Sequence, residues 1–525
     1  MKRALLALLI LPFFAVAFAS DAHSENDEIP IDRDYLSKYA EDIQVMNLIS
    51  LDDIHRAIKS DYNLFMWDFK HITKLKNGIK VDPKRFSGYT WIGPYPHEGE
   101  DVEYDIKRFR RKTGVYGGWG EIPMYYLFLP GYDYHNWKEK GTISLRLELW
   151  YEQPHADMYL GQYDTIVSFK REKNIYFKLP SIIEGPGINL VRSERPDVAV
   201  VSYKFSKAIP STVEVRDTDG KAVGSFESNG AQRWNEIPLT GLKPNSTYEY
   251  KVVYGELETK WYKFYTAPEK GGEGFSFAFA SDSRGDRGES DGKLMGINEY
   301  VLERIGNLAY NNDARFMVYG GDLIQGYSTD VEDYVMQMGA WKMALAGYRR
   351  SYPVYPFMGN HEHLVRNFIT GKKYGLSLDR WPYATQSSEA VFASCFVNPK
   401  NGPVAKDDRR PPYSETAFSF HYGNVKFICL NDDYWTSYMA HKTGGAPEGY
   451  MLPEQVEWLQ SELDSADNDD TVDYVLIAMH EALFPNSYHF TDAGWYLGDN
   501  KWRAHYYDHE KDELIPEEKG VIEVR

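Results

Sequence analysis

The spacing of apolar and polar residues predicts mostly strands in the first part of the chain. Residues 143–150 alternate between apolar and polar side chains with a period of two, as in a strand that buries one face. The same pattern recurs at residues 164–169 and 174–179, whereas residues 34–46 and 51–60 have helical spacing. We therefore expect residues 20–180 to form a mostly β domain, whose role the sequence does not identify.

Short strand-like runs separated by turn signals follow within residues 181–268. The runs cover residues 199–205, 212–217, 247–254 and 261–266. Asp219-Gly220, after the second run, is a hairpin-type turn. Several short strands at this spacing predict a β-sandwich. The Gly-rich, charged residues 269–274 are then expected to form a short linker.

Strand and helix patterns alternate in the last part of the chain. Strands are expected at residues 275–280, 315–319, 354–358, 425–430 and 474–478, and helices at residues 297–310, 331–349 and 453–464. This alternation predicts a layered α/β domain over residues 275–525. The fold class is therefore multidomain: a mostly β domain, a β-sandwich and an α/β sandwich.

Four of these expected strands run directly into residue types that bind metals. The four sequences are Ser281-Asp282-Ser283-Arg284-Gly285, Gly321-Asp322, Gly359-Asn360-His361-Glu362 and His480. Because strand ends in an α/β sheet meet at one crevice, we expect these side chains to converge. An Asp after a strand is often only a turn or a helix cap, and a lone His is often a loop residue, but four such ends in this order favour a metal site. Carboxylate, amide and imidazole ligands together suit Mn, Fe or Zn.

These motifs resemble those of the calcineurin-like metallophosphoesterase superfamily over residues 275 to about 490, and within it most nearly the purple acid phosphatases and their bacterial relatives. The resemblance implies two divalent or trivalent metal ions (Fe, Mn or Zn) and a small phosphate ester as substrate. It implies that Asp282 binds the first metal and that Asp322 bridges both. Asn360 and His480 would then bind the second metal, and His361 would act as general acid or orient the phosphate.

The β-sandwich segment carries a resemblance of its own. Residues 239–250 resemble the E–F corner of a fibronectin type III fold, in which a Tyr hydroxyl ties a loop back to the sheet. Residues 181–268 also resemble the N-terminal domain that precedes the catalytic domain of purple acid phosphatases. We therefore expect a fibronectin-like sandwich in front of the α/β domain.

The first metal position departs from the family pattern. Arg284 stands where the superfamily has His, or Gly in the purple enzymes, and it either contacts the substrate phosphate or is a surface residue. Gln325 stands where the purple enzymes have a metal-bound Tyr, and Tyr327 comes two residues later, so the colour of an iron–tyrosinate is not expected. Glu362 is expected to orient His361 or the loop rather than to bind metal.

The resemblance also implies a Gly-His-x-His element after His480, and none is present. We therefore expect the phosphoesterase domain to be incomplete at its C-terminus. His505 and His509, four residues apart, are an alternative source of ligands if they lie on a helix, although their polar surroundings favour a solvated segment. Residues 514–525 look like the beginning of a helix, and His489 is a weaker loop candidate.

Composition and the first residues bear on compartment and partners. Residues 1–19 combine a basic start, an apolar run and a small-x-small ending, which predicts a signal peptide and a secreted or periplasmic protein without a membrane span. The net charge of −18 disfavours nucleic acid as a partner. Cys395 and Cys429 either pair in an oxidising compartment or are buried thiols.

The sequence supports two candidate functions. The first is metal-dependent hydrolysis of a phosphate ester at a dinuclear site. The alternative is an exported surface protein with an impaired phosphoesterase domain, in which the aromatic-rich N-terminal domain contacts a glycan or a protein partner. The 41 Tyr and 13 Trp residues suit such contacts, although they suit ordinary sheet packing equally well.

Overall fold

The structure, a computed structural model, describes most of the chain between residues 45 and 523. The described residues are 45–94, 109–129, 133, 136–272, 274–285, 293–365, 383–406, 410–436, 445–446 and 449–481, and the backbone of three later strands. The expected signal peptide at residues 1–19, nearly all of the expected helix at residues 34–46, and the candidates His489 and His509 lie outside these residues.

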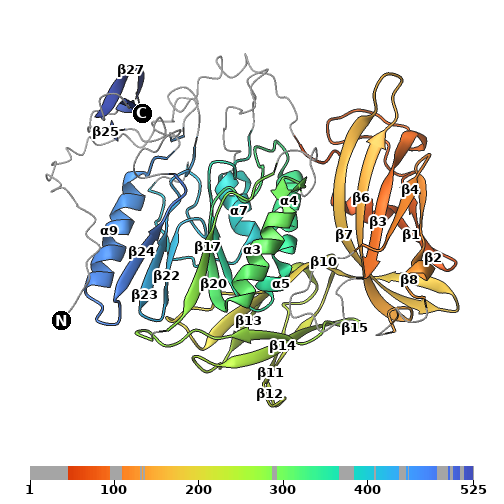
Figure 1. Ribbon diagram of the computed structural model, residues 1–525, viewed down its shortest axis with the longest axis horizontal. Helices are drawn as coiled ribbons and strands as arrows, with labels where there is room; N and C mark the ends of the chain where they lie inside the picture. Colours follow the sequence, from red (N-terminus) through yellow and green to blue (C-terminus); the bar gives the residue numbers. More distant parts are fainter. Residues whose placement is uncertain are drawn as a thin grey trace.

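The N-terminal domain is mostly β, as expected (Figure 1). One antiparallel sheet has the order β4-β3-β6-β7-β8 and another the order β1-β2-β5. The strands are β1 (Ile58–Asp61), β2 (Leu64–Asp68), β3 (Phe86–Pro94), β4 (Arg111–Val115), β5 (Trp119–Ile122), β6 (Lys140–Tyr151), β7 (Met158–Glu172) and β8 (Ile175–Leu179). Buried Trp67 joins the two sheets by donating from Nε1 to the Thr90 hydroxyl at 2.8 Å.

The helix expected at residues 51–60 is shorter than its pattern suggests. Helix α2 (Leu51–Ala57) begins at Ser50, whose hydroxyl accepts a hydrogen bond from the backbone of Asp53. It ends where Ile58 pairs with Trp67 of β2, because β1 gains a strand partner that the local pattern does not reveal. The tertiary contact therefore overrides the helical spacing.

The second domain consists of two sheets that share one core. One sheet has the order β13-β10-β9, and in the other β14 lies between β11 and the short strands β15 and β16. The strands are β9 (Ile182–Asn189), β10 (Val198–Ile209), β11 (Thr212–Asp217), β12 (Ala222–Glu227), β13 (Gln232–Thr240), β14 (Thr247–Tyr254), β15 (Leu257–Glu258) and β16 (Tyr262–Tyr265). The hydroxyl of Tyr248 accepts a hydrogen bond from the backbone N–H of Lys243 at 3.0 Å, which is the loop tie expected there. The fibronectin-like identity itself stays a prediction.

The third domain places two three-stranded sheets between helices (Figure 1). Strands β17, β20 and β21 are parallel, and β22-β23-β24 form the other sheet. The strands are β17 (Ser276–Ala280), β18 (Lys293–Leu294), β19 (Ile297–Asn298), β20 (Ala314–Gly320), β21 (Val354–Phe357), β22 (Phe418–Tyr422), β23 (Val425–Cys429) and β24 (Tyr474–Ala478). The helices are α3 (Glu299–Asn311), α4 (Val331–Ala344), α5 (Ala346–Arg349), α6 (Tyr383–Gln386), α7 (Ser388–Cys395) and α9 (Pro453–Asp467).

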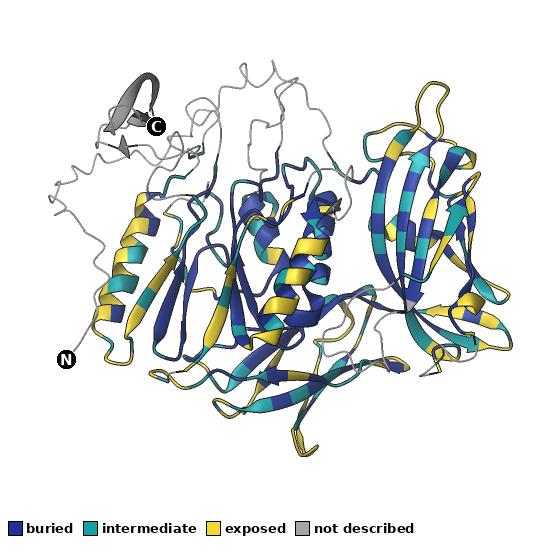
Figure 2. Cartoon of the chain, in the orientation of Figure 1, coloured by how far each residue is buried: buried dark blue, intermediate teal, exposed yellow. Residues whose placement is uncertain are grey.

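Aromatic side chains hold the two sheets of this domain together. The ring of Phe316 on β20 lies 5.0 Å from that of Phe427 on β23 and 4.8 Å from that of Tyr422 on β22. Figure 2 shows these inner strands mostly buried, whereas α9 and α3 expose one face. The expected strands and helices of this domain form within a few residues of their predicted ends. The expected helix at residues 331–349 is interrupted at Leu345 and divides into α4 and α5.

The end of the chain corrects one expectation. Residues 514–525 do not begin a helix: β27 (Glu513–Glu523) pairs antiparallel with β26 (Lys501–Asp508), next to β25 (Trp495–Tyr496). His505 lies in β26 opposite Pro516, so the four-residue helical spacing to His509 does not apply. Strand-forming residues such as Tyr506 and Ile515 are paired here, and a single-segment pattern cannot show that pairing.

The state of the two cysteines is decided within the described residues. Cys395 on α7 and Cys429 on β23 are both buried and free, so the thiol alternative is confirmed over a disulfide. Burial raises the pKa of the Cys429 thiol above its usual value, which makes it unreactive. None of the helices in the described part of the chain combines the length and apolarity needed to cross a bilayer.

Candidate metal site

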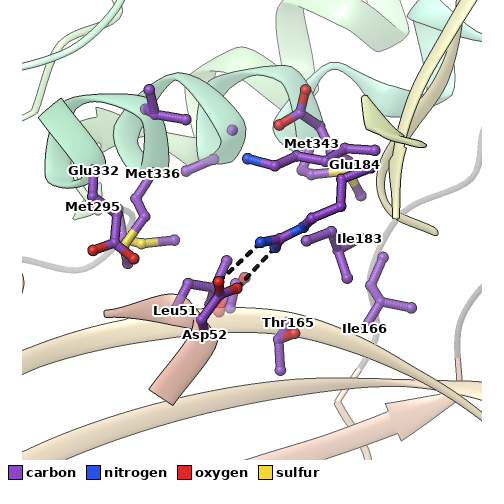
Figure 3. Close-up of a pocket in the computed structure, with 16 residues that line it drawn as sticks. Leu51, Asp52, Thr165, Ile166, Ile183, Glu184, Met295, Glu332, Met336 and Met343 are labelled. Atoms are coloured by element: carbon purple, nitrogen blue, oxygen red, sulfur yellow. Dashed lines mark hydrogen bonds and ion pairs between the residues drawn. The ribbon is translucent and has the colours of Figure 1, made fainter. Parts of the chain in front are cut away.

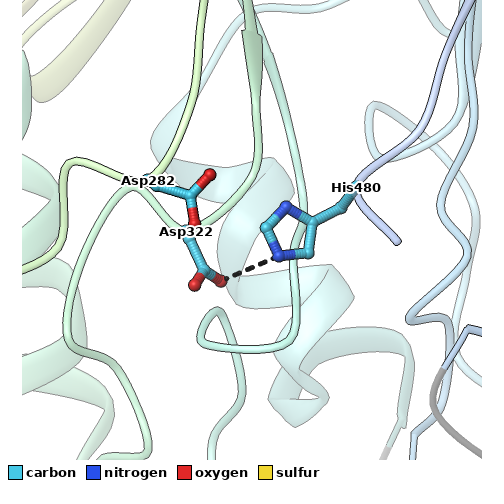
Figure 4. A group of neighbouring side chains, drawn as sticks. All are labelled: Asp282, Asp322 and His480. Atoms are coloured by element: carbon cyan, nitrogen blue, oxygen red, sulfur yellow. Dashed lines mark ion pairs between the residues drawn. The ribbon is translucent and has the colours of Figure 1, made fainter. Parts of the chain in front are cut away.

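Three of the expected ligands meet at the strand ends. Asp282 follows β17, Asp322 follows β20, and His480 follows β24. Their potential ligand atoms all lie within 4.8 Å of one another (Figure 4). The convergence expected from the sequence is therefore present for these side chains.

Backbone conformation at the strand ends brings these residues together. Asp282 and Asp322 have φ values of 57° and 52°, and Gly321 has a φ of 74°. This left-handed conformation is uncommon for residues other than Gly and clusters at functional sites. A Cβ on Gly321 would lie 2.7 Å from the Gly359 Cα and 2.7 Å from the His480 Nδ1, so only glycine fits between β21 and His480.

Glu362 organises the two central loops. It is fully buried, and its carboxylate accepts hydrogen bonds from the backbone N–H groups of Asp322, Leu323, Ile324 and Gly359 at 2.8–3.2 Å. Burial, and then the nearby Asp322 carboxylate, raise the pKa of Glu362 to about 8, while the backbone donors oppose this shift. As the sequence suggested, Glu362 orients the loop.

His480 is oriented as a metal ligand must be. Its Nδ1 lies 2.8 Å from the carbonyl oxygen of Gly320, which can only accept, so Nδ1 donates the proton. The other ring nitrogen, Nε2, faces Asp322 with 3.3 Å to Oδ1. Burial lowers the pKa of His480, but the Asp322 carboxylate outweighs it and the pKa is raised to about 9. A cation bound between these side chains would displace the Nε2 proton.

His361 and Asn360 lie in the turn after β21. The backbone N–H of His361 donates to Oδ1 of Asp322 at 3.1 Å, and its Nδ1 donates to the carbonyl of Gln325 at 2.8 Å. The other ring nitrogen of His361, Nε2, lies 3.9 Å from Oδ2 of Asp322. Burial lowers the pKa of this imidazole. Asn360 is half-buried between Gly359 and His361. His361 therefore lies beside Asp322, and Asn360 precedes it in the chain.

Arg284 is an exposed residue whose side chain pairs with Asp322. Its Nε donates to Oδ2 of Asp322 at 2.6 Å, and its backbone N–H donates to the Asp322 carbonyl at 3.0 Å.

Gln325, in the position of the family tyrosine, is buried, and the ring of Tyr327 packs edge-on against His361 with 4.7 Å between centroids.

The acidic residues that follow β23 also lie at the site, although the sequence analysis did not single them out. Buried Asp432, after β23, accepts hydrogen bonds from the backbone of His480 at 3.2 Å and of Glu481 at 2.8 Å. Burial raises the pKa of Asp432 to about 6. Asp433, His480 and Glu481 form a second group whose potential ligand atoms lie within 4.8 Å of one another. The signal was available, because β23 is one more strand that ends in acidic residues.

The strand-end motifs lie within a segment that matches a protein-family model. Residues 277–512 match the family model of the calcineurin-like phosphoesterases. Two uncharacterized proteins from two strains of Mycobacterium tuberculosis are each 26% identical to this chain over 268 residues. That match covers 49% of this chain and 44% of each relative, so it spans less than half of their length.

Solved structures show more distant likenesses. A purple acid phosphatase from yellow lupin (Lupinus luteus) seeds aligns with a TM-score of 0.44 and 14% identity, over 82% of this chain and 72% of that one. PhoD aligns with a TM-score of 0.40 and 16% identity, over 56% and 61%. A dimetal phosphatase from Danio rerio has a TM-score of 0.27 and 16% identity, over 40% and 71%. Likenesses at these scores establish nothing about the site of this chain.

Proposed function

We propose that the protein, whose residues 277–512 match the calcineurin-like phosphoesterase family model, hydrolyses a phosphate ester at the ends of β17, β20, β21 and β24. The observation that carries the proposal is the meeting of Asp282, Asp322 and His480 within 4.8 Å. We assign Asp282 and Asp322 to a first metal ion and Asp322, Asn360 and His480 to a second. The ions are Fe, Mn or Zn, and the substrate is a small phosphate ester.

The donor set fits such ions. Carboxylates, an amide and an imidazole with its Nδ1 proton held by Gly320 match the ligand preferences of these metals. When bound, the ions would neutralise charge on the phosphoryl oxygens and lower the pKa of a water molecule. The chain itself contributes orientation: Glu362 fixes the backbone of Asp322, and the Gly320 carbonyl fixes the ring of His480.

His361 and Arg284 act on the substrate in this proposal. With Nδ1 donating to Gln325, Nε2 is the atom of His361 that takes up and releases a proton. Burial lowers the pKa of His361, and a phosphate dianion next to it would raise that pKa again, which favours proton donation to the leaving group. The planar guanidinium of Arg284 contacts a phosphate oxygen from the more exposed side.

A charge-neutral change of Asp322 tests this function. Asp322→Asn should lose most of the bound metal and of the hydrolysis of p-nitrophenyl phosphate, because the central carboxylate is gone. Asp219→Asn is the matched control, since Asp219 is exposed in a hairpin turn and Asn-Gly suits that turn equally well. Metal content from mass spectrometry and initial rates are measured on both proteins. Unchanged metal content and rate in Asp322→Asn would remove the proposed site.

We also propose that the protein is exported to the periplasm or the medium. The support is the signal-peptide pattern of residues 1–19. N-terminal sequencing of the protein recovered from outside the cytoplasm should begin after Ala19. Recovery of the intact N-terminus in the cytoplasmic fraction alone would contradict export.

A further inference from the structure

A cavity of about 270 Å³ lies between the N-terminal β domain, the β-sandwich and helix α4. Thr165 and Ile166 come from β7, and Ile183 and Lys204 come from β9 and β10. Figure 3 shows these walls facing α4 across the cavity. None of the residues assigned to the metal site lines it. It is therefore a separate feature, and it exists only where these three parts of the chain pack together.

Helix α4 presents an apolar face to this cavity. Its lining residues are Glu332, Val335, Met336, Gly339, Ala340 and Met343, spaced three and four apart, so they lie along one side of the helix. The opposite side is used by the metal domain: Tyr334 donates to the Glu362 carbonyl at 3.1 Å, and Trp341 donates to Ser283 at 3.1 Å. Met336 and Met343, with flexible and polarizable side chains, can adapt to an apolar ligand.

The carboxylates at the cavity already have cationic partners. Asp52 accepts two hydrogen bonds from Arg233 at 2.8 and 2.9 Å (Figure 3). The other pairs are Asp164 with Arg146 at 2.8 Å, Glu332 with Lys76 at 3.2 Å, and Glu184 with Lys342. These acidic side chains therefore do not require a cationic ligand.

Lys204 is different. It is half-buried at the cavity and interacts electrostatically with the carboxylates of Asp52 and Glu184. Among the residues that the structure describes, none forms a hydrogen bond or a salt bridge with its ammonium group. An anion in direct contact with this ammonium group would add a hydrogen-bonded pair that the described residues do not supply. The cavity thus combines one cation without a direct partner with the apolar side chains of Ile166, Ile183 and Met336.

We infer that this cavity binds a small carboxylate with an aliphatic body, whose anionic end pairs with Lys204 and whose body lies against Met336 and Met343. A volume of about 270 Å³ lies just below the roughly 300–1,000 Å³ of pockets for drug-sized ligands, which suits a smaller acid such as octanoate. Binding requires both the carboxylate and the aliphatic body of the ligand, because Lys204 supplies a charge at one place in the cavity and the side chains of Met336 and Met343 are apolar.

Isothermal titration of the full chain with octanoate tests the inference. Octanoate should bind, whereas octylamine, with the opposite charge, and acetate, without the chain, should not. Lys204→Met should weaken octanoate binding by roughly tenfold or more. Lys207→Met, an exposed lysine on the same strand β10, should leave it unchanged. Absence of octanoate binding, equal binding of octylamine or of acetate, or unchanged binding by Lys204→Met would overturn the proposal.

A second variant tests the apolar wall without changing a charge. Met343→Trp should fill the cavity and abolish octanoate binding, while Met343→Leu should retain it. Met343 is half-buried, so the larger ring has room to be accommodated, and thermal unfolding of the variant verifies the fold. Retained binding in a folded Met343→Trp protein would place the ligand elsewhere. Because the titration measures binding alone, its result is independent of the proposed hydrolysis.

Discussion

The guanidinium of Arg284 donates from Nε to Oδ2 of Asp322 across 2.6 Å, while Nε2 of His480 approaches the other carboxylate oxygen at 3.3 Å. Asp322 thus lies between two cationic groups. A metal ion that binds Asp322 displaces a proton from His480, but it can displace Arg284 only by moving the side chain, because a guanidinium stays charged. In the proposed metal site, Arg284 would therefore compete with a metal ion for Asp322.

Removing this competitor should tighten metal binding. Arg284→Ala is expected to lower the Kd for Mn²⁺ by roughly tenfold, since a charge-assisted hydrogen bond is worth about 1.5 kcal/mol or more. The KM for p-nitrophenyl phosphate should rise at the same time if Arg284 contacts the phosphate. Calorimetric titration with Mn²⁺ and steady-state kinetics separate these effects, and Arg284→Lys, which retains the charge, should lie between native and Ala. Weaker Mn²⁺ binding by Arg284→Ala would show that the residue supports the metal.

The hydrogen bonds from four backbone N–H groups to Glu362 predict that this side chain stabilises the fold. Glu362→Gln replaces one acceptor oxygen by an N–H₂ group that faces N–H donors, so the variant should lose about 2–3 kcal/mol of unfolding free energy. Urea titration followed by intrinsic fluorescence measures the difference. Glu457→Gln is the control: its exposed pair with Lys406 should contribute less than about 1 kcal/mol. Equal stability of the two variants would refute the organising role of Glu362.

The sequence predicted the layered domain and the convergence of side chains at its strand ends because each depends on a short local pattern. Asp282, Asp322 and His480 each follow an apolar run, and parallel strands bring such ends together. The contact between Arg284 and Asp322 could not be predicted, because it depends on the left-handed backbone of both Asp residues. The hairpin of β26 and β27 was missed because residues 513–523 lack the alternation of apolar and polar side chains that marks a strand, so only the pairing with β26 reveals it.

The coupling of His480 to Asp322 predicts a pH dependence of the metal-free protein. The folded-state pKa of His480 is raised to about 9 from an ordinary value of 6.5, so its stabilising contribution is complete below pH 6.5 and is lost as pH rises through about 9. Unfolding free energy measured after chelation should therefore fall over this window. Mn²⁺ affinity should rise over the same window, because the Nε2 proton must leave.

His480→Gln provides the comparison for this pH effect. The variant has no titrating imidazole beside Asp322, so its stability and its residual Mn²⁺ affinity should change less between pH 6.5 and 9. Urea titrations and metal titrations at several pH values measure both quantities. A native pH profile that coincides with that of His480→Gln would show that another group titrates in this range.

Gly321 allows the cost of backbone strain to be separated from the cost of crowding. Gly321→Ala places a methyl group 2.7 Å from both the Gly359 Cα and the His480 Nδ1, on a residue with a φ of 74°. Gly220→Ala has a similar φ of 82°, but no atom lies within 4 Å of the added Cβ. The control should therefore lose only the strain of a left-handed residue, about 1–2 kcal/mol.

Gly321→Ala should lose more stability than this control and should also bind Mn²⁺ more weakly, because the methyl group pushes His480 away from Asp322. Urea titration gives the stability of both variants, and calorimetry gives their Mn²⁺ affinity. Loss of metal affinity in Gly321→Ala but not in Gly220→Ala would follow from the close packing of His480. Equal losses of stability together with native metal affinity in both would mean that the β20 loop can move aside, and that Gly321 serves only its own backbone conformation.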